Sequence, residues 1–191
     1  MKTIYKKIYN TINLKHLSFF VYYSILLTSV VLFFIDRFYF LISLSVFLLI
    51  LISNNFFKFS PFELISISGV SYLSIIGSLG AYNIFFYDKV VHLLTIFFIT
   101  LIILNRLDIE KEYKYFFGIL IAMGVSASWE IYEYFYDTIF YGQMQGVYRH
   151  GNQLLDKLDD TMFDIVFGGI GSFLATISKM FSLYLKEGRE K

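Results

Sequence analysis

The amino-acid sequence predicts an all-α, polytopic membrane protein, built as a six-helix transmembrane bundle. Hydrophobic residues make up 57% of the 191-residue chain and charged residues only 16%, against about 25% charged residues in a typical soluble domain. The apolar residues form runs long enough for helices that cross a bilayer. Short polar or charged stretches separate these runs, which is where a membrane chain leaves the hydrocarbon.

The first two spans are predicted at residues 17–35 and 38–57. A single helix over Leu17–Ile52 would be about 54 Å long, well beyond a hydrocarbon core of about 30 Å. The chain must therefore turn, and Asp36-Arg37 interrupts the apolar run at a suitable place. These residues are the predicted turn.

Three segments follow from this pattern. Residues 1–16 are predicted to be a basic cytoplasmic segment, either a short helix on the membrane surface or a frayed tail. Residues 17–185 form the six-span transmembrane domain, and residues 186–191 form a cytoplasmic tail.

The third span has a recognisable beginning. In Ser60-Pro61-Phe62-Glu63, Ser60 can cap the helix, Pro61 suits its first position and Glu63 completes a capping box. We expect this span to continue to about Phe86.

Three more spans complete the chain. They are predicted at about residues 88–104, 115–136 and 161–185. The connection over residues 138–159 is long, and such loops are often functional or disordered. We interpret it as a candidate lid that packs over a pocket, with His150 as a surface residue.

The distribution of lysine and arginine predicts the orientation. With six spans, both termini and two connections lie on one side of the membrane, and that side carries twelve of the sixteen basic residues. The positive-inside rule places this side in the cytoplasm. The chain is thus expected in the cell membrane, with both termini cytoplasmic.

This orientation brings three clusters of ionisable residues to the outer ends of spans four, five and six. Within each helix the spacing puts the charged side chains on one face. Charged groups are costly when they face lipid, so we expect the three faces to turn towards one another and form a pocket. The candidate catalytic residues are Asp88, His92, Glu130, Glu133, Asp160 and Asp164.

Each of these residues also has a structural interpretation. Asp88 and Asp160 are suitable helix N-caps, and Glu133, with Asp137, fits a solvated helix end. His92, Glu130 and Asp164 lie deeper, and carboxylates with an imidazole suit a divalent metal ion. We interpret these three as candidate metal ligands. Trp129 and its neighbouring tyrosines fit an aromatic belt at the membrane surface.

Three functions remain open at this point. A bound metal ion is expected to activate water for hydrolysis of a lipid or lipid-linked substrate, or the pocket relays protons in a small transporter. Alternatively, the polar cluster orders the helices around a cation without catalysis. Nucleic acid is excluded as a partner because the net charge is only +1 and no basic tract occurs. The chain has no cysteine, which excludes thiolate chemistry.

Three motifs resemble the VanZ-like membrane proteins, and more closely their YjdF-like relatives. They are Asp88-Lys89-Val90-Val91-His92, Trp129-Glu130-Ile131-Tyr132-Glu133, and Asp160-Thr161-Met162-Phe163-Asp164 with Gly168 and Gly171. The resemblance covers about residues 85–175. It implies a small multi-pass membrane protein, without implying an activity. The sequence departs from the VanZ-like pattern in having no Gln after the Glu, and Arg149 lies too far from the last motif to be its arginine.

Overall fold

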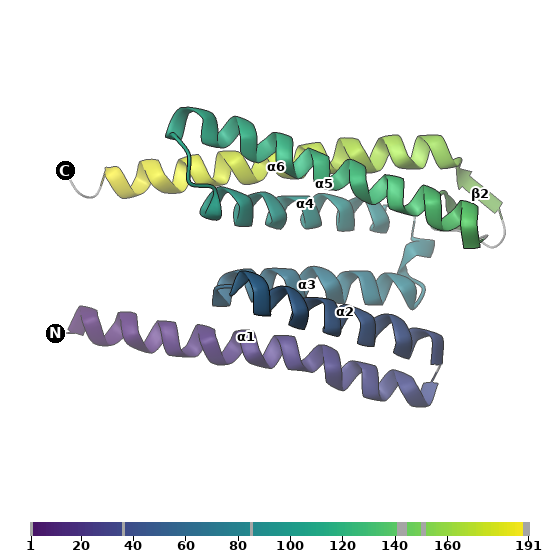
Figure 1. Cartoon of the computed structure of the whole chain (residues 1–191), viewed down its shortest axis with the longest axis horizontal. Coiled ribbons are helices and arrows are strands. Elements are labelled where there is room, and N and C mark those ends of the chain that lie inside the picture. Colours follow the sequence, from purple (N-terminus) through teal and green to yellow (C-terminus); the bar gives the residue numbers. More distant parts are fainter. Residues whose placement is uncertain (1, 36, 85, 141–144, 150–151, 189–191) are drawn as a thin grey trace. The chain divides into compact units, whose positions relative to one another are not determined.

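The structure is a computed structural model, which describes residues 2–35, 37–84, 86–140, 145–149 and 152–188. These residues form six α helices, which confirms the predicted all-α class (Figure 1). The helices are α1 (Lys2–Ile35), α2 (Arg37–Phe57), α3 (Pro61–Ser78), α4 (Tyr87–Arg106), α5 (Lys111–Phe140) and α6 (Lys157–Glu187).

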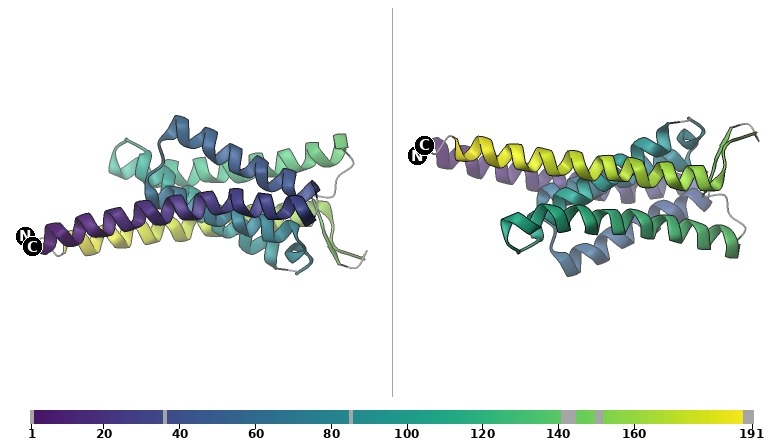
Figure 2. Two further views of the ribbon diagram at one scale, coloured as in Figure 1. Left: turned by 90° about the horizontal axis from the view of Figure 1, so that it is seen from below. Right: turned by 90° about the horizontal axis from the view of Figure 1, so that it is seen from above.

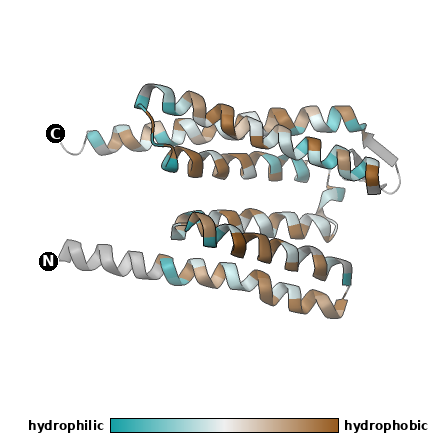
Figure 3. Cartoon of the chain, viewed as in Figure 1, coloured by the Kyte–Doolittle hydropathy of each residue, from teal (hydrophilic) through white to brown (hydrophobic). Residues whose placement is uncertain are grey.

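Five of the six helices are long and apolar enough to cross a membrane. These segments are Leu14–Ile35, Tyr39–Phe57, Tyr87–Arg106, Tyr113–Ile139 and Lys157–Leu185. Their hydrophobic character is visible in Figure 3, and many large apolar side chains on them are exposed, as lipid contact requires. The chain is thus a multi-pass membrane protein. The sixth helix, α3, has 18 residues and is not among the five, so its predicted crossing stays a prediction.

Several helix ends differ from the predicted ones. The helix α1 is continuous from Lys2, so residues 2–16 are its first turns and not a separate surface helix. The helix α3 ends at Ser78, short of the predicted end near Phe86, because the chain turns at Gly80 with φ of 120°. This left-handed conformation favours glycine. The predicted turn at Asp36-Arg37 falls partly on Asp36, which lies outside the described residues.

The predicted start of α3 is confirmed. The backbone N–H of Glu63 donates to Ser60 Oγ at 3.4 Å, and the backbone N–H of Ser60 donates to Glu63 Oε2 at 2.7 Å. Pro61 occupies the first helical position. This reciprocal capping satisfies two N–H groups that a helix start otherwise leaves without partners.

The chain divides into two compact units. The first, Met1–Leu79, contains α1, α2 and α3. Its core consists of apolar side chains from all three helices, among them Tyr22, Ile25, Phe47 and Leu64. Buried hydroxyl groups add contacts between the helices, as where Ser29 Oγ donates to Ser43 Oγ at 2.8 Å.

The second unit, Gly80–Lys191, contains α4, α5 and α6, and each of these helices packs against the other two (Figure 2). Gly168 and Gly171 of the third quoted motif lie at these contacts. A Cβ atom on Gly171 of α6 would overlap the backbone carbonyl of Leu93 on α4, and one on Gly168 would lie 2.6 Å from Ser126 Oγ on α5. The helices approach closely because these side chains are absent.

The connection between α5 and α6 contains a short hairpin that we did not predict. The strands β1 (Val147–Arg149) and β2 (Asn152–Leu155) pair antiparallel, with Tyr148 opposite Gln153. These strands are only three and four residues long and lack the alternation typical of a half-buried strand, so periodicity gave no signal. His150 and Gly151, between the strands, lie outside the described residues.

Candidate functional site at the ends of α4, α5 and α6

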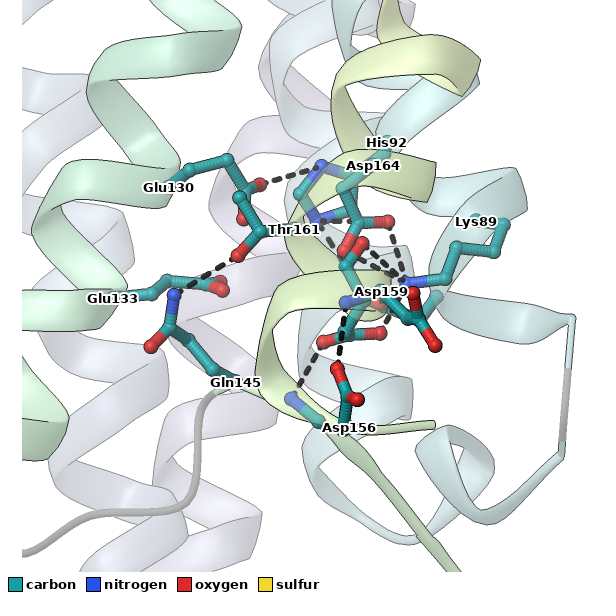
Figure 4. Close-up of polar contacts among 12 residues, drawn as sticks. Lys89, His92, Glu130, Glu133, Gln145, Asp156, Asp159, Thr161 and Asp164 are labelled. Atoms are coloured by element: carbon teal, nitrogen blue, oxygen red, sulfur yellow. Dashed lines mark hydrogen bonds and ion pairs between the residues drawn. The ribbon is translucent and has the colours of Figure 1, made fainter. Parts of the chain in front are cut away.

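The centre of the polar cluster is Lys89, which belongs to the first quoted motif but was not among the candidate site residues. Its side chain is 3% exposed. The ammonium Nζ donates to both carboxylate oxygens of Asp164 at 2.8 Å, to Asp88 Oδ2 at 3.1 Å and to the carboxylate of Asp160 (Figure 4). One buried cation thus joins the first turns of α4 and α6.

His92 lies one turn further along α4, among three carboxyl groups. Its Nε2 is 3.6 Å from Asp88 Oδ1 and 3.9 Å from Asp164 Oδ1, and its Nδ1 is 3.6 Å from Glu130 Oε1. These distances are too long for hydrogen bonds. The imidazole is therefore surrounded by carboxylate oxygens without being bonded tightly to any of them.

Glu130 projects from α5 towards this histidine and is 3% exposed. Neither of its carboxylate oxygens accepts a hydrogen bond from a described residue. Thr161 also lies near it, and the Thr161 hydroxyl accepts a hydrogen bond from Gln145 Nε2 at 3.0 Å. A buried carboxyl group without a donor is costly, and such groups gather at functional sites.

Glu133 and Asp137 are buried, so the predicted solvated helix end is wrong for both. Glu133 Oε1 accepts a hydrogen bond of 2.6 Å from the indole N–H of Trp129. Asp137 Oδ2 accepts from Lys157 Nζ at 2.9 Å and from the backbone N–H of Gln145 at 3.1 Å. Trp129, expected only in an interfacial belt, is thus also a hydrogen-bond donor to the cluster.

The two predicted helix caps are also wrong. The N-cap of α4 is Phe86, which makes no side-chain capping bond, and Asp88 lies inside the first turn. At α6, Asp156 Oδ1 accepts from the backbone N–H of Asp159 at 2.8 Å and takes the capping role. Asp160 is thereby free to bind Lys89. The predicted boundaries were only a few residues off, which is enough to change the capping residue.

The beginning of the α5–α6 connection closes one side of the cluster. Besides the Gln145 contacts, the backbone N–H of Gly146 donates to Asp160 Oδ2 at 2.7 Å. Gln145 itself is buried. These contacts place residues 145 and 146 beside the cluster, and the lid role of residues 138–159 stays a prediction. Residues 141–144 of this connection lie outside the described residues.

All six candidate site residues therefore lie in one region of the second unit. Five carboxyl groups face one ammonium and one imidazole among the described residues; they belong to Asp88, Glu130, Glu133, Asp160 and Asp164. Bound protons or a further cation must balance the excess negative charge. The spacing did contain a signal for Lys89, because Lys89 and His92 are three residues apart and share a helix face.

One group of these residues has ligand atoms close enough to hold a metal ion. One ligand atom each from Asp88, His92 and Asp164 lie within 4.8 Å of one another. The predicted ligand set was His92, Glu130 and Asp164. In the structure, Asp88 and Asp164 both face the Nε2 atom of His92, whereas Glu130 faces the Nδ1 atom.

The comparisons with known proteins support a membrane family. A family model described as "Predicted membrane protein (DUF2238)" matches residues 11–186. No curated protein and no solved structure matches the chain.

Proposed function

The chain belongs to the DUF2238 family of predicted membrane proteins, and we propose that its second unit binds a divalent metal ion at the ends of α4, α5 and α6. Asp88, His92 and Asp164 are the proposed ligands. Glu130 is the proposed partner of the imidazole on the side away from the ion.

The observation that carries the proposal is the separation of the ligand atoms. Two atoms that each lie about 2.1 Å from one metal ion are about 3.0 Å apart at an angle of about 90° and about 3.6 Å apart at about 120°. His92 Nε2 lies 3.6 Å from Asp88 Oδ1 and 3.9 Å from Asp164 Oδ1. These distances are too long for hydrogen bonds. The separation of 3.6 Å matches two ligands of one ion, and the separation of 3.9 Å needs a slight approach of Asp164 to His92. The Asp88 side chain is 21% exposed and has room to rotate towards it.

Glu130 supports the same assignment from the other side of the ring. Histidines that bind metals almost always donate their second N–H to a carboxylate, a carbonyl or a water molecule, which fixes the ring orientation. Glu130 Oε1 faces Nδ1 at 3.6 Å, with neither oxygen otherwise bonded. A small approach of Glu130 to His92 would form a hydrogen bond from Nδ1–H to Oε1.

Lys89 supplies the remaining positive charge. It binds both oxygens of Asp164, and a carboxylate oxygen has lone pairs for a lysine and a metal ion at once. We therefore assign Lys89 as a positioning residue that holds Asp164 near His92.

The donor set also suggests the kind of metal. Carboxylates alone suit Mg²⁺, Ca²⁺ and Mn²⁺, whereas imidazole suits zinc, copper, iron and nickel. One imidazole with two carboxylates is expected to prefer Mn²⁺, Fe²⁺ or Zn²⁺ over Mg²⁺ and Ca²⁺.

Metal content tests the proposal directly. The full-length protein, purified in detergent without chelator and resupplied with Mn²⁺ or Zn²⁺, is expected to hold about one ion per chain by mass spectrometry of the metals. Asp164→Asn should abolish this binding, and Glu130→Gln should weaken it by about 10–100-fold because Glu130 acts through the imidazole.

The matched control is Asp108→Asn, which removes an exposed carboxylate from the α4–α5 connection and should bind metal as the parent does. Thermal unfolding of each variant establishes that it is folded, and Glu130→Gln leaves the contacts of Lys89 intact. A parent protein that binds no divalent ion, or variants that bind it equally well, would refute the metal site.

A metal-dependent hydrolase acting on a lipid or lipid-linked substrate is the second candidate function. It is favoured by the three-ligand set, which leaves coordination positions for water and substrate. The same samples test it, since the loaded parent should release a water-soluble product from a membrane lipid extract and Asp164→Asn should not. Absence of any product from the loaded parent rejects hydrolysis of these lipids, and leaves the metal site standing.

We also propose that the chain lies in the cell membrane with both termini cytoplasmic and the metal site outside, which requires α3 to cross. The chain has no native cysteine, so single cysteines at Asn55, Asn83, Lys111 and Leu158 can be labelled in intact cells by a reagent that does not cross membranes. We expect labelling at Asn83 and Leu158 only. Labelling of Asn55 and Asn83 on the same side would show that α3 does not cross.

The resemblance to the VanZ-like and YjdF-like proteins is part of the proposal as well. Its support is that residues from all three quoted motifs meet at this site: Lys89 and His92, Glu130, and Asp164.

A further inference from the structure

A second polar site lies at the other end of the same three helices. An open pocket of about 400 Å³ lies between the end of α4, the beginning of α5 and the end of α6. Its lining includes three lysines, Lys111, Lys114 and Lys179, and one acidic residue, Glu187. The pocket is therefore basic, whereas the metal site is acidic.

The three lysines differ in how far they are neutralised. Lys111 Nζ pairs with Glu187 Oε1 at 3.3 Å, but both side chains are exposed. Exposed ion pairs of this kind contribute little stabilisation, so Glu187 does not hold Lys111 firmly. Lys179 donates to the neutral Asn105 side chain. Lys114 is half-buried, and its side chain has no hydrogen-bond or ion-pair partner among the described residues. The pocket thus retains positive charge that a ligand can use.

The position of the pocket along the helices indicates where in the membrane such a ligand lies. About 26 Å of helix separates Asp88 from Asn105 on α4 at 1.5 Å per residue, close to the hydrocarbon thickness of a bilayer. The metal site and the basic pocket therefore lie near opposite membrane surfaces. Leu104 and Leu183 also line the pocket, so the lysines stand next to an apolar wall.

We propose that this pocket binds the phosphate headgroup of an anionic phospholipid. Lysine ammonium groups bind phosphate oxygens by charge-assisted hydrogen bonds, and basic pockets between membrane helices bind anionic headgroups at the cytoplasmic surface. The apolar wall favours a lipid over free phosphate, because it contacts the first methylene groups of the acyl chains. The proposal is independent of the metal site and of the hydrolase candidate.

Lipid retention by the full-length protein tests this assignment. Protein in phosphatidylcholine nanodiscs is titrated with phosphatidylglycerol, and bound lipid is counted by native mass spectrometry. Each lysine near an anionic surface contributes a free energy that corresponds to about a fivefold change in affinity. Lys114→Ala should thus weaken phosphatidylglycerol binding about fivefold, and Lys114→Ala with Lys179→Ala about 25-fold.

Lys15→Ala is the matched control, since it removes an exposed lysine from α1 in the other unit and should leave binding unchanged. Separate arms replace the lipid with inorganic phosphate or glycerol 1-phosphate, which should bind far more weakly. Equal weakening by Lys15→Ala would show nonspecific attraction to a charged membrane and overturn the site. Equal binding of phosphatidylcholine, or of inorganic phosphate, would overturn the anionic lipid as ligand.

Discussion

Replacing Lys89 with methionine is expected to lower the free energy of unfolding by about 3–5 kcal/mol. The variant keeps the length of the side chain but leaves the carboxylates of Asp160 and Asp164 without their shared cation. Removal of one partner from a buried ion pair is strongly destabilising, because the remaining charge stays buried and uncompensated. Unfolding in detergent, followed by circular dichroism against temperature or denaturant, measures the change.

Two further variants make this prediction specific. Lys111→Met removes a lysine paired with Glu187, where both side chains are exposed, and should cost no more than about 1 kcal/mol. Adding Asp160→Asn to Lys89→Met should restore part of the lost stability by removing one uncompensated carboxylate. If Lys89→Met unfolds like the parent, the ion cluster does not exist in the folded protein.

Replacing Gly171 with alanine is expected to destabilise the second unit by about 1–3 kcal/mol, the usual cost of overpacking a well-packed contact. The added methyl group would overlap the backbone carbonyl of Leu93, and a backbone atom cannot move aside as a flexible side chain can. The helix α6 would therefore shift away from α4. Because Asp164 and His92 lie on these two helices, metal binding should weaken as well.

Gly124→Ala is the control for this experiment. Gly124 lies on α5 in the same unit and has open space around the position of a Cβ atom, so alanine should be neutral or slightly stabilising through its better helix propensity. Thermal unfolding and metal titration compare the stability and the metal affinity of the two variants. Equal behaviour of the two alanine variants would contradict the close α4–α6 contact.

Much of the fold and part of the site could be predicted from the sequence. Long apolar runs indicated the helices, and the capping box at Ser60 marked the start of α3. Helical spacing put His92, Glu130 and Asp164 on inward faces, since charged groups avoid lipid. These predictions succeeded because each depends on one helix and its surroundings.

The missing parts depend on the arrangement of several helices. Spacing could not tell whether Lys89 extends towards the membrane surface or turns inward, because a long lysine side chain can do either. It also could not decide which side of the His92 ring Glu130 would face. The capping roles of Asp88 and Asp160 were wrong because the helices begin a residue or a few residues earlier, and the hairpin has no hydrophobic alternation to reveal it.

The opposite charges at the two ends of α4 have a consequence in an energised cell. Carboxylates at one end and lysines at the other give the second unit an electric dipole along its helices. Moving one elementary charge through a membrane potential changes its energy by about 2.3 kcal/mol per 100 mV. A negative cell interior therefore favours the orientation in which the lysines face the cytoplasm. This is the same orientation that the distribution of lysine and arginine predicts.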